Sequence, residues 1–341
     1  MSTKIEWATD TWNPTTGCTK VSPGCANCYI ERQAPMRIAG RRFVRGAIPI
    51  ELHPERLQVP LHWYSPRRVF VDSMSDLFHE DVPEKYIAKV LAVCELAYWH
   101  QFLILTKRPE RMRALLTNED FQFHIGWFAS QAMREFGLDE ARFGPHVTEN
   151  PPNVWLGTTA ENQRMAARRV PELLATPAAV HFVSLEPLLS PIDLRPWIPY
   201  GEPCEIPHSD IYHGHCSRCG ESEDLQENDD GLAWSDTDHE CPPGFGPSLD
   251  WVITGGESGG PDARRLVEQV RECVEYDVMR TPHNRYAKVW KPKPAALEMV
   301  RSLRDQCEAA GVAFFFKQWG GPHSKSGGRE LDGREWSDYP L

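Results

Sequence analysis

The sequence predicts an α/β fold: a (β/α) barrel of parallel strands, partial or TIM-like, that carries a Cys-rich metal-binding insertion. Three observations predict it. Short apolar runs rich in β-branched residues alternate with helix-like segments along the chain. These runs are apolar on both faces, as buried parallel strands are. Nearly every run ends in polar residues, which is typical of the edge of such a sheet where active sites form.

The expected strands are seven short runs, and the expected helices lie between them. The strands cover residues 12–17, 68–73, 101–106, 153–158, 179–184, 250–255 and 312–317. The helices cover residues 83–99, 108–116, 160–175 and 295–311. Gly311 closes the last helix, because glycine readily adopts the left-handed conformation that ends a helix. Alternation over this length favours a barrel or an open parallel sheet.

Residues 199–249 interrupt the alternation. This segment has few apolar residues and no periodicity, so we expect an insertion between two barrel strands. Long loops are uncommon unless they are functional or stapled. The barrel domain then comprises residues 1–198 and 250–319, and residues 320–341 form a Gly-rich C-terminal tail.

The bulk composition is that of an ordinary globular protein. Of 341 residues, 41% are hydrophobic and 25% are charged, and the formal net charge is −11. This charge excludes a global basic field, so any contact with nucleic acid needs a local patch. No apolar run is long enough to span a membrane, and the N-terminus shows no signal-peptide pattern. We therefore expect a cytoplasmic protein with reduced thiols and no membrane partner.

Ten cysteines in a reducing compartment favour metal ligation over disulfides. Three stand alone and are interpreted as packing residues: Cys94, Cys273 and Cys307. Four lie in the insertion and predict a closed tetrahedral zinc site: Cys204, Cys216, Cys219 and Cys241. Bound zinc would supply the folding energy that so polar a segment lacks. His215 or His239 in place of one cysteine, and a loop with free thiols, are the alternatives.

The remaining cysteines form a different group near the N-terminus. Cys18, Cys25 and Cys28 have the spacing C-x6-C-x2-C, and Tyr29 follows directly. Three thiolates on a [4Fe–4S] cluster leave one iron open, which a chemical site needs and a structural site avoids. In such enzymes that iron chelates S-adenosyl-L-methionine, and electron transfer then yields a carbon radical. A zinc site with a distant fourth ligand and three metal-free thiols are the alternatives.

Six blocks of the sequence carry a family resemblance. They are GCTKVSPGCANCY, FVDSMSDLFHEDVP, LTKRPERM, FVSLEPLLSPIDL, WVITGGESGGPDARR and FFFKQWGG. With these blocks the chain resembles the phage and prophage three-Cys-motif family, which is similar to radical S-adenosylmethionine enzymes. The resemblance implies a barrel fold and a [4Fe–4S] cofactor more than a substrate. The first cysteine gap is six residues here, whereas well-characterised radical enzymes have C-x3-C-x2-C. Their GGE segment normally lies at the end of the second strand, whereas here it is Gly255-Gly256-Glu257, far downstream.

Polar residues at the expected strand ends are the candidates for chemistry. Catalytic roles are assigned to Asp72, Lys107, Glu186 and Lys317. Cofactor contacts are assigned to Asp76, Arg108, Gly255, Gly256, Glu257 and Ser258. Paired carboxylates can act as base and acid, or can hold a ribose hydroxyl. A cation pair at a helix N-terminus is a ready anion site. The plainer alternatives are a helix cap for Asp76 and a solvated charge pair for Lys107 and Arg108.

The leading interpretation is a radical S-adenosylmethionine-like enzyme from a mobile element, with structural zinc and an electron donor of the flavodoxin or ferredoxin type. We expect it to act on a nucleotide, nucleobase or nucleic acid, because residues 106–113 and 164–169 are local basic stretches. One alternative is a barrel that exchanges nucleobases, as transglycosylases do, with zinc as a staple only. Another is a non-catalytic binding module, which six polar strand ends count against.

Overall fold

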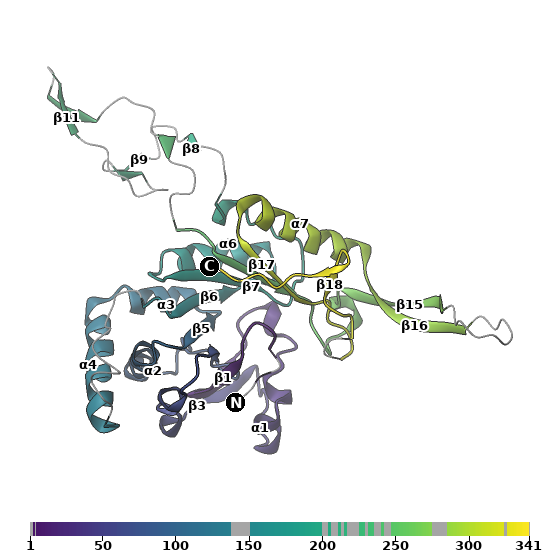
Figure 1. Ribbon diagram of the computed structural model, residues 1–341, viewed down its shortest axis with the longest axis horizontal. Helices are drawn as coiled ribbons and strands as arrows, with labels where there is room; N and C mark the ends of the chain where they lie inside the picture. Colours follow the sequence, from purple (N-terminus) through teal and green to yellow (C-terminus); the bar gives the residue numbers. More distant parts are fainter. Residues whose placement is uncertain are drawn as a thin grey trace.

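A single parallel sheet organises the protein. The computed structural model describes residues 3, 5–137, 151–199, 247–274, 285–323 and 326–340, together with short strands between residues 204 and 241. The sheet has seven strands in the order β1-β4-β5-β6-β7-β14-β17, and all of its pairings are parallel. Its strands follow chain order across the sheet (Figure 1), as they do in a TIM barrel. The predicted α/β fold is confirmed as a half-barrel.

Six of these strands lie within two residues of their predicted ends. The strands are β1 (Asp10–Trp12), β4 (Arg68–Val71), β5 (Gln101–Thr106), β6 (Val154–Thr159), β7 (Val180–Leu185), β14 (Trp251–Gly255) and β17 (Ala313–Gln318). β4 ends early because Asp72 has a φ of 56°, which extended backbone does not allow. The first strand is the exception: β1 precedes the predicted range, and β2 (Thr15–Thr19) pairs antiparallel with β3 (Ala47–Leu52) instead.

The helices cover one face of the sheet. They are α2 (Glu84–Leu96), α3 (Pro109–Leu116), α4 (Glu119–Glu135), α6 (Gln163–Leu174) and α7 (Pro294–Ala310). Gly311 ends α7 with a φ of 67°, as predicted. The sequence analysis missed α4, which begins where the Asn118 side chain accepts a hydrogen bond from the amide of Phe121. No helix among the described residues is long and apolar enough to cross a membrane.

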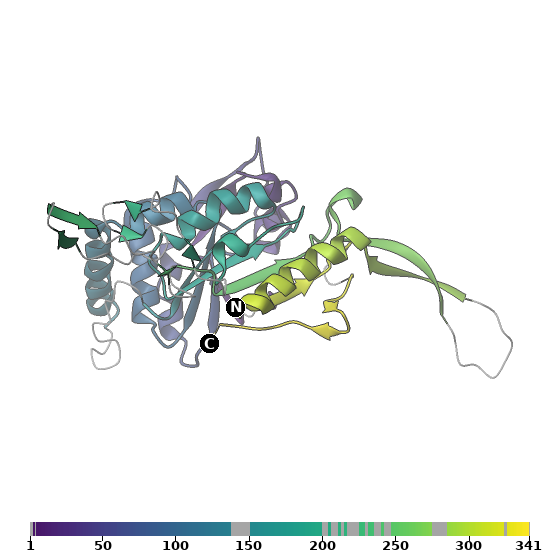
Figure 2. The ribbon, with the colours of Figure 1, turned by 90° about the horizontal axis from the view of Figure 1, so that it is seen from above.

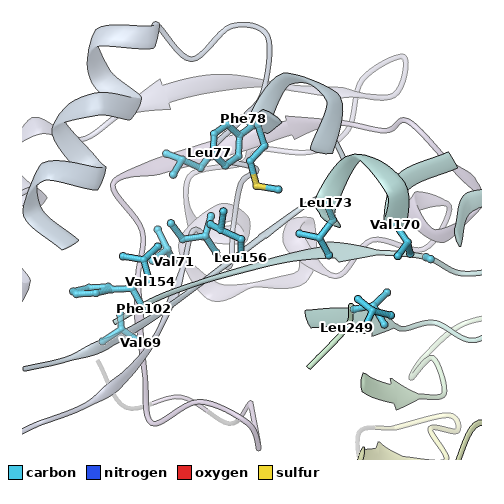
Figure 3. Packing of buried hydrophobic residues seen from close by; sticks show 14 of the residues in the cluster. Val69, Val71, Leu77, Phe78, Phe102, Val154, Leu156, Val170, Leu173 and Leu249 are labelled. Atoms are coloured by element: carbon cyan, nitrogen blue, oxygen red, sulfur yellow. The ribbon is translucent and has the colours of Figure 1, made fainter. Parts of the chain in front are cut away.

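Two hydrophobic cores lie on opposite faces of the sheet. The outer core joins strand residues such as Val71, Phe102 and Leu156 to helix residues such as Val170 and Leu173 (Figure 3). The inner core is aromatic and lies on the concave face: Trp7, Phe70, Trp155, Phe182, Trp251 and Phe315 contribute its rings. Because successive strand residues alternate between faces, Lys317, two positions beyond Phe315, lies on this same inner face at the end of β17.

Trp7 fills the concave side from the N-terminal segment. Its ring lies 4.6 Å from that of Phe70 and 6.4 Å from those of Phe182 and Trp251. Gly157 of β6 leaves room for Phe182, since a Cβ at this position would lie 2.5 Å from its ring. The interior is therefore packed at the N-terminal ends of the strands, which leaves the C-terminal ends for a site.

Two further elements extend this body. β15 (Val267–Val274) and β16 (Arg285–Pro292) form an antiparallel ribbon that projects from the sheet (Figure 2), inside the range predicted to be barrel. The tail bears the short hairpin β18 (Glu330–Leu331) and β19 (Arg334–Glu335). Beyond it the tail runs along β17, where the Phe316 amide donates to the carbonyl of Trp336. The predicted tail thus covers an exposed sheet edge.

The insertion is described only as short backbone pairs. These are β8 (Cys204–Glu205) with β13 (Glu240–Cys241), β9 (Ile211–Tyr212) with β10 (His215–Cys216), and β11 (Leu225–Asn228) with β12 (Gly231–Trp234). The predicted zinc ligand Cys219 lies outside the described residues, and so do the side chains of the other three.

A small cavity between α2, α4 and β6 holds an unusual carboxylate. Glu95 lines it with apolar neighbours that include Leu91 and Ile125, and its Oε2 atom is buried without a hydrogen-bond partner among the described residues. Burial raises the pKa of Glu95 from 4.5 to about 8. The folded protein therefore binds a proton more tightly than the unfolded chain does.

This burial predicts a pH-dependent stability. Because the folded pKa is the higher one, the stability should be complete below pH 4.5 and should fall as pH rises towards 8, by at most about 1.4 kcal/mol per pH unit. Chemical denaturation of Glu95→Gln across this range should give a flatter profile than the parent protein. An unchanged slope in the variant would show that other groups cause it.

Candidate functional site

The three N-terminal cysteines lie at the carboxyl ends of the parallel strands. Cys18 belongs to β2, which follows β1 after two residues, and Cys25 ends the short 3-10 helix η1 (Pro23–Cys25). Gly17 makes the tight pairing of β2 with β3 possible. Its φ is 102°, and a Cβ there would lie 2.1 Å from the carbonyl oxygen of Pro49. All three cysteines are free thiols.

The thiols are near enough to affect one another electrostatically. Burial raises the pKa of Cys18 to about 12, and the charges of Asp76, Cys25 and Cys28 add to this effect. Burial likewise raises the pKa of Cys28, with a contribution from Cys25. As they stand, no three His, Cys, Asp or Glu side chains in the described part of the chain form a group that could hold a metal ion.

Of the three N-terminal cysteines, Cys25 is the one whose pKa is lowered. Burial opposes ionisation, but the Lys107 ammonium and hydrogen bonds from the backbone of Val21 and Ser22 hold the pKa of Cys25 below its usual value. The Lys107 charge also offsets part of the rise in the pKa of Cys28. Since thiolates are the ligands of iron and zinc, a free cation beside the cysteines favours metal binding. The residue types, three cysteines beside a lysine, are therefore those that a thiolate-bound metal would need.

The role of Lys107 can be tested on the metal-free protein. Lys107→Met removes the charge that lowers the pKa of Cys25, so iodoacetamide should alkylate this thiol about three- to tenfold more slowly near neutral pH. Peptide mass spectrometry follows the rate at each cysteine. Lys20→Met is the matched control, because Lys20 is not among the main influences on the pKa of Cys25. Equal rates at Cys25 in parent and Lys107→Met would contradict the assignment.

A buried glutamate holds the cysteine loop from one side. Glu161 follows β6 with a side chain that is 0% exposed, and its Oε1 accepts a hydrogen bond of 2.9 Å from the Gly24 amide. Its Oε2 accepts one of 3.2 Å from Arg169, which also donates to the Thr159 carbonyl. Although burial favours the neutral acid, Ser22, Gly24 and Arg169 hold the pKa of Glu161 below its usual range.

A second carboxylate holds the loop from the other side. Glu257 Oε2 accepts hydrogen bonds from Asn27 at 3.1 Å and from Arg264 Nε at 2.9 Å. Arg264 then donates from both terminal nitrogens to the Pro23 carbonyl, at 3.1 and 3.0 Å. Glu257 was predicted to contact a cofactor; in the structure its carboxylate fixes the loop that bears Cys25.

The other members of the predicted cofactor segment also make internal contacts. A Cβ at Gly256 would lie 2.1 Å from the Trp319 carbonyl oxygen, so this glycine permits two backbones to cross closely. The Gly255 carbonyl accepts from the amide of Leu188. Ser258 Oγ accepts a hydrogen bond of 3.1 Å from Gln318. The segment 255–258 therefore joins β14 to the residues that follow β17.

Asp76 and Arg108 form a buried pair beneath Cys18. Arg108 Nη1 donates to Asp76 at 3.0 Å, and both side chains are less than one-tenth exposed. Asp76 also accepts from the hydroxyl of Thr106 at 2.7 Å and from the amide of Lys107 at 3.0 Å. These bonds fix the β5 end and so place Lys107, which points to a positioning role for both residues.

Asp72 lies deeper than the other predicted catalytic residues. It is 4% exposed, and its two oxygens accept from the amide and the hydroxyl of Thr15, at 3.0 and 2.9 Å. Burial raises the pKa of Asp72 to about 7, against the hydrogen bonds from Thr15. Its position ties the end of β4 to the start of β2 and hence to the cysteines.

Glu186 and Lys317 meet at the mouth of the half-barrel. Lys317 Nζ lies 2.7 and 2.9 Å from the two oxygens of Glu186, and each side chain is 19% exposed. Tyr29 is 42% exposed as a residue, but its hydroxyl donates to the Ser73 carbonyl. Burial of this hydroxyl and the charges of Cys28 and Glu186 raise the pKa of the phenol. The structure thus brings this ion pair to the cysteine loop.

Sequence reasoning overlooked three residues of the site. Two of them, Glu161 and Arg264, reach the cysteine loop from distant parts of the chain. The third, Asn27, lies within the loop. Glu161 carried a signal, since it stands among the polar residues that follow β6. Arg264 carried none, because an arginine after a glycine-rich turn is ordinary.

The fold and the site together define a class: half-barrel α/β proteins with three cysteines held over the carboxyl ends of their strands. The family model described as protein of unknown function (DUF5131) matches residues 2–279 and 290–340. The chain belongs to this family. No curated protein and no solved structure matches it.

Proposed function

We propose that this protein is an iron–sulfur enzyme of the radical S-adenosylmethionine type, which acts on a nucleotide, nucleobase or nucleic acid. The observation that carries the proposal is a set of three free thiols at the active-site edge of a parallel half-barrel, two of which, Cys18 and Cys28, pack against the same small core. A [4Fe–4S] cluster bound there would reduce S-adenosyl-L-methionine and so supply a carbon radical.

The chain's own residues would prepare and hold the site. Cys18, Cys25 and Cys28 would bind the cluster. Lys107 would favour the thiolate forms of Cys25 and Cys28, and Arg108 that of Cys18. Glu161 and Arg264 fix the backbone of the loop between the first two ligands, so the three thiols could come together on the metal by rotation of their side chains. Gly24 must stay small, since a Cβ there would lie 3.1 Å from the Glu161 carboxyl carbon.

The ion pair at the mouth is the candidate for substrate contact. Glu186 and Lys317 each offer polar atoms on the partly exposed side of the inner face. A substrate hydroxyl or phosphate could reach the pair, because 19% of each side chain remains exposed. Lys317 Nζ is then the atom that would donate a hydrogen bond or proton to the substrate, and a Glu186 oxygen the one that would accept.

The nucleobase-exchange alternative receives less support. It needs a carboxylate at the end of β4 that can reach a sugar. Both oxygens of Asp72 are occupied by Thr15, and the side chain is 4% exposed. We keep Asp72 as a residue that fixes β2 rather than as a nucleophile.

A structural zinc in the insertion belongs to the same proposal. The backbone register supports it, because Cys204 and Cys241 lie directly opposite each other in the β8–β13 ladder. Two ligands on paired strands are already close, and one tetrahedral ion could join them to the knuckle around Cys216.

Anaerobic purification tests the proposed function. We expect brown protein with broad absorption near about 400 nm, about four irons and as many sulfides per chain. Incubation with dithionite and S-adenosyl-L-methionine should then release 5′-deoxyadenosine. Colourless protein with zinc alone would overturn the iron–sulfur assignment, whereas iron without deoxyadenosine would overturn the radical chemistry.

A further inference from the structure

Residues 32–45 have a charge opposite to that of the whole molecule. The segment RQAPMRIAGRRFVR contains five arginines and no acidic residue, in a chain with net charge −11. It comprises α1 (Ala34–Ile38) and the turn that leads into β3. Figure 1 shows α1 at the periphery of the body, away from the helical layer of α2 and α4. We call it the arginine face.

The arginines of this face divide into anchors and free groups. Arg41 is an anchor, which donates to Glu51 at 2.6 Å and to the Thr16 hydroxyl at 2.7 Å. Arg32 donates to the Ser258 carbonyl at 3.5 Å. The three others are exposed and make no side-chain hydrogen bond or ion pair with a described residue: Arg37, Arg42 and Arg45. Three cations are therefore available to a partner.

The arginine face adjoins the cysteines directly. Met36 of α1 and Ile48 of β3 are 2% and 1% exposed and form a small core with Ile30. Cys18 and Cys28 pack against this same core. A molecule held by the face would consequently lie one layer of side chains away from the proposed cluster.

Apolar groups are interspersed with the free cations. Ile38 is 83% exposed and Val44 is 71% exposed, while Tyr29 beside Cys28 is 42% exposed. Exposed aliphatic and aromatic groups among arginines suit a ligand that combines phosphates with flat bases. Guanidinium groups pair with phosphate oxygens in a bidentate manner, and every cation of the segment is an arginine.

Most arginines of the two basic stretches, residues 106–113 and 164–169, have partners within the protein. Arg113 pairs with Glu172 at 2.7 Å, and Arg168 pairs with Glu110 at 2.9 Å. Arg169 is buried against Glu161. These guanidinium groups already have carboxylate partners, so a phosphate bound there would meet the negative charge of a neighbouring carboxylate. Arg37, Arg42 and Arg45 of the arginine face have no carboxylate partner among the described residues, so a phosphate could bind them without this competition.

We propose that the arginine face binds a polynucleotide and presents it to the three-cysteine site. The inference rests on the proposed function, and it narrows the substrate from nucleotide or nucleobase to a nucleic-acid chain. Phosphates would contact Arg37, Arg42 and Arg45, and the bases would lie against Ile38, Val44 and Tyr29.

Fluorescence anisotropy with the full-length protein tests the proposal. The probes are labelled single-stranded DNA, RNA of the same sequence and duplex DNA, each of about 20 nucleotides. With three phosphate contacts, affinity should fall about 20- to 40-fold between about 50 and 200 mM salt. The variant with Arg37→Gln, Arg42→Gln and Arg45→Gln should bind at least about tenfold more weakly at low salt and lose most of this salt dependence.

The matched control removes the same charge elsewhere. Arg113→Gln, Arg168→Gln and Arg195→Gln replace arginines that are paired with Glu172, Glu110 and Asp193. We expect this control to bind like the parent. Equal losses in both variants would show a diffuse charge effect and overturn the proposal, as would the failure of every probe to bind.

Metal content separates this proposal from the proposed function. Binding is measured on the protein as purified and after chelation. If a protein without iron binds RNA through the three arginines, the polynucleotide-binding proposal stands and the proposed enzymatic function is overturned. Conversely, if the protein is an active enzyme but binds no polynucleotide, only the proposal for the arginine face is overturned. Arginine-dependent binding of an acidic flavodoxin, with no oligonucleotide bound, would make the face an electron-donor site and overturn the proposal.

Discussion

Glu161→Ala should destabilise the protein by about 3 kcal/mol or more. The substitution leaves the Arg169 guanidinium, 3% exposed, without its buried carboxylate partner, and breaking such a pair typically costs about 3–5 kcal/mol. It also strips the Gly24 amide of its acceptor. Urea denaturation of the metal-free protein measures the loss, and the thermal midpoint should fall by several degrees.

Two control variants show whether the effect of Glu161→Ala comes from the buried ion pair. Glu161→Gln keeps an acceptor for the Gly24 amide but removes the charge, so its loss should be intermediate. Glu172→Ala removes a carboxylate from an exposed pair with Arg113 and should change stability by less than about 1 kcal/mol. If Glu161→Ala were no worse than Glu172→Ala, the buried pair would not hold the loop.

Individual replacement of Cys18, Cys25 or Cys28 by alanine should abolish iron binding. A cluster held by three thiolates loses a third of its ligands in each variant, so iron should fall from about four per chain to less than one. Release of 5′-deoxyadenosine should disappear with it. Elemental analysis of anaerobically purified variants, together with absorption spectra, provides the measurement.

The insertion supplies the control for the cysteine variants. Cys216→Ala should reduce zinc and leave iron unchanged, because we assign the two metals to separate sites. Iron that persists in Cys25→Ala, or that vanishes in Cys216→Ala, would contradict the division of the cysteines. Cys307→Ala removes a buried thiol of α7 and should alter neither metal.

The sequence was a good guide to the strands and a poor one to the contacts between loops. β5 coincides with its predicted range because an apolar run with polar ends has one consistent interpretation. α4 was missed because Phe121, Phe123, Trp127 and Phe128 give it a strand-like aromatic content. The end of β4 depends on the positive φ of Asp72, which composition does not predict.

The site shows the same division. Three cysteines within eleven residues were visible as a group, and the strand ends that surround them followed from alternation. The carboxylates that fix the loop were not visible as partners, since Glu161 lies 137 positions from Gly24 and Arg264 lies 241 positions from Pro23. Pairings at such separation are set by the closed fold and leave no local pattern.

The C-terminal tail closes a gap that the sheet leaves open. The ring of Tyr339 lies 5.1 Å from that of Trp251 and 5.6 Å from that of Phe315, near the last strands. The Arg68 guanidinium of β4 lies over the Tyr339 ring, 3.7 Å from its centre. The Tyr339 hydroxyl donates to the Glu6 carbonyl at 3.5 Å. One aromatic ring thus clasps opposite margins of the half-barrel. Removal of the last residues by a carboxypeptidase should consequently loosen the N-terminal segment around Glu6, far away in sequence, before it disturbs the helices.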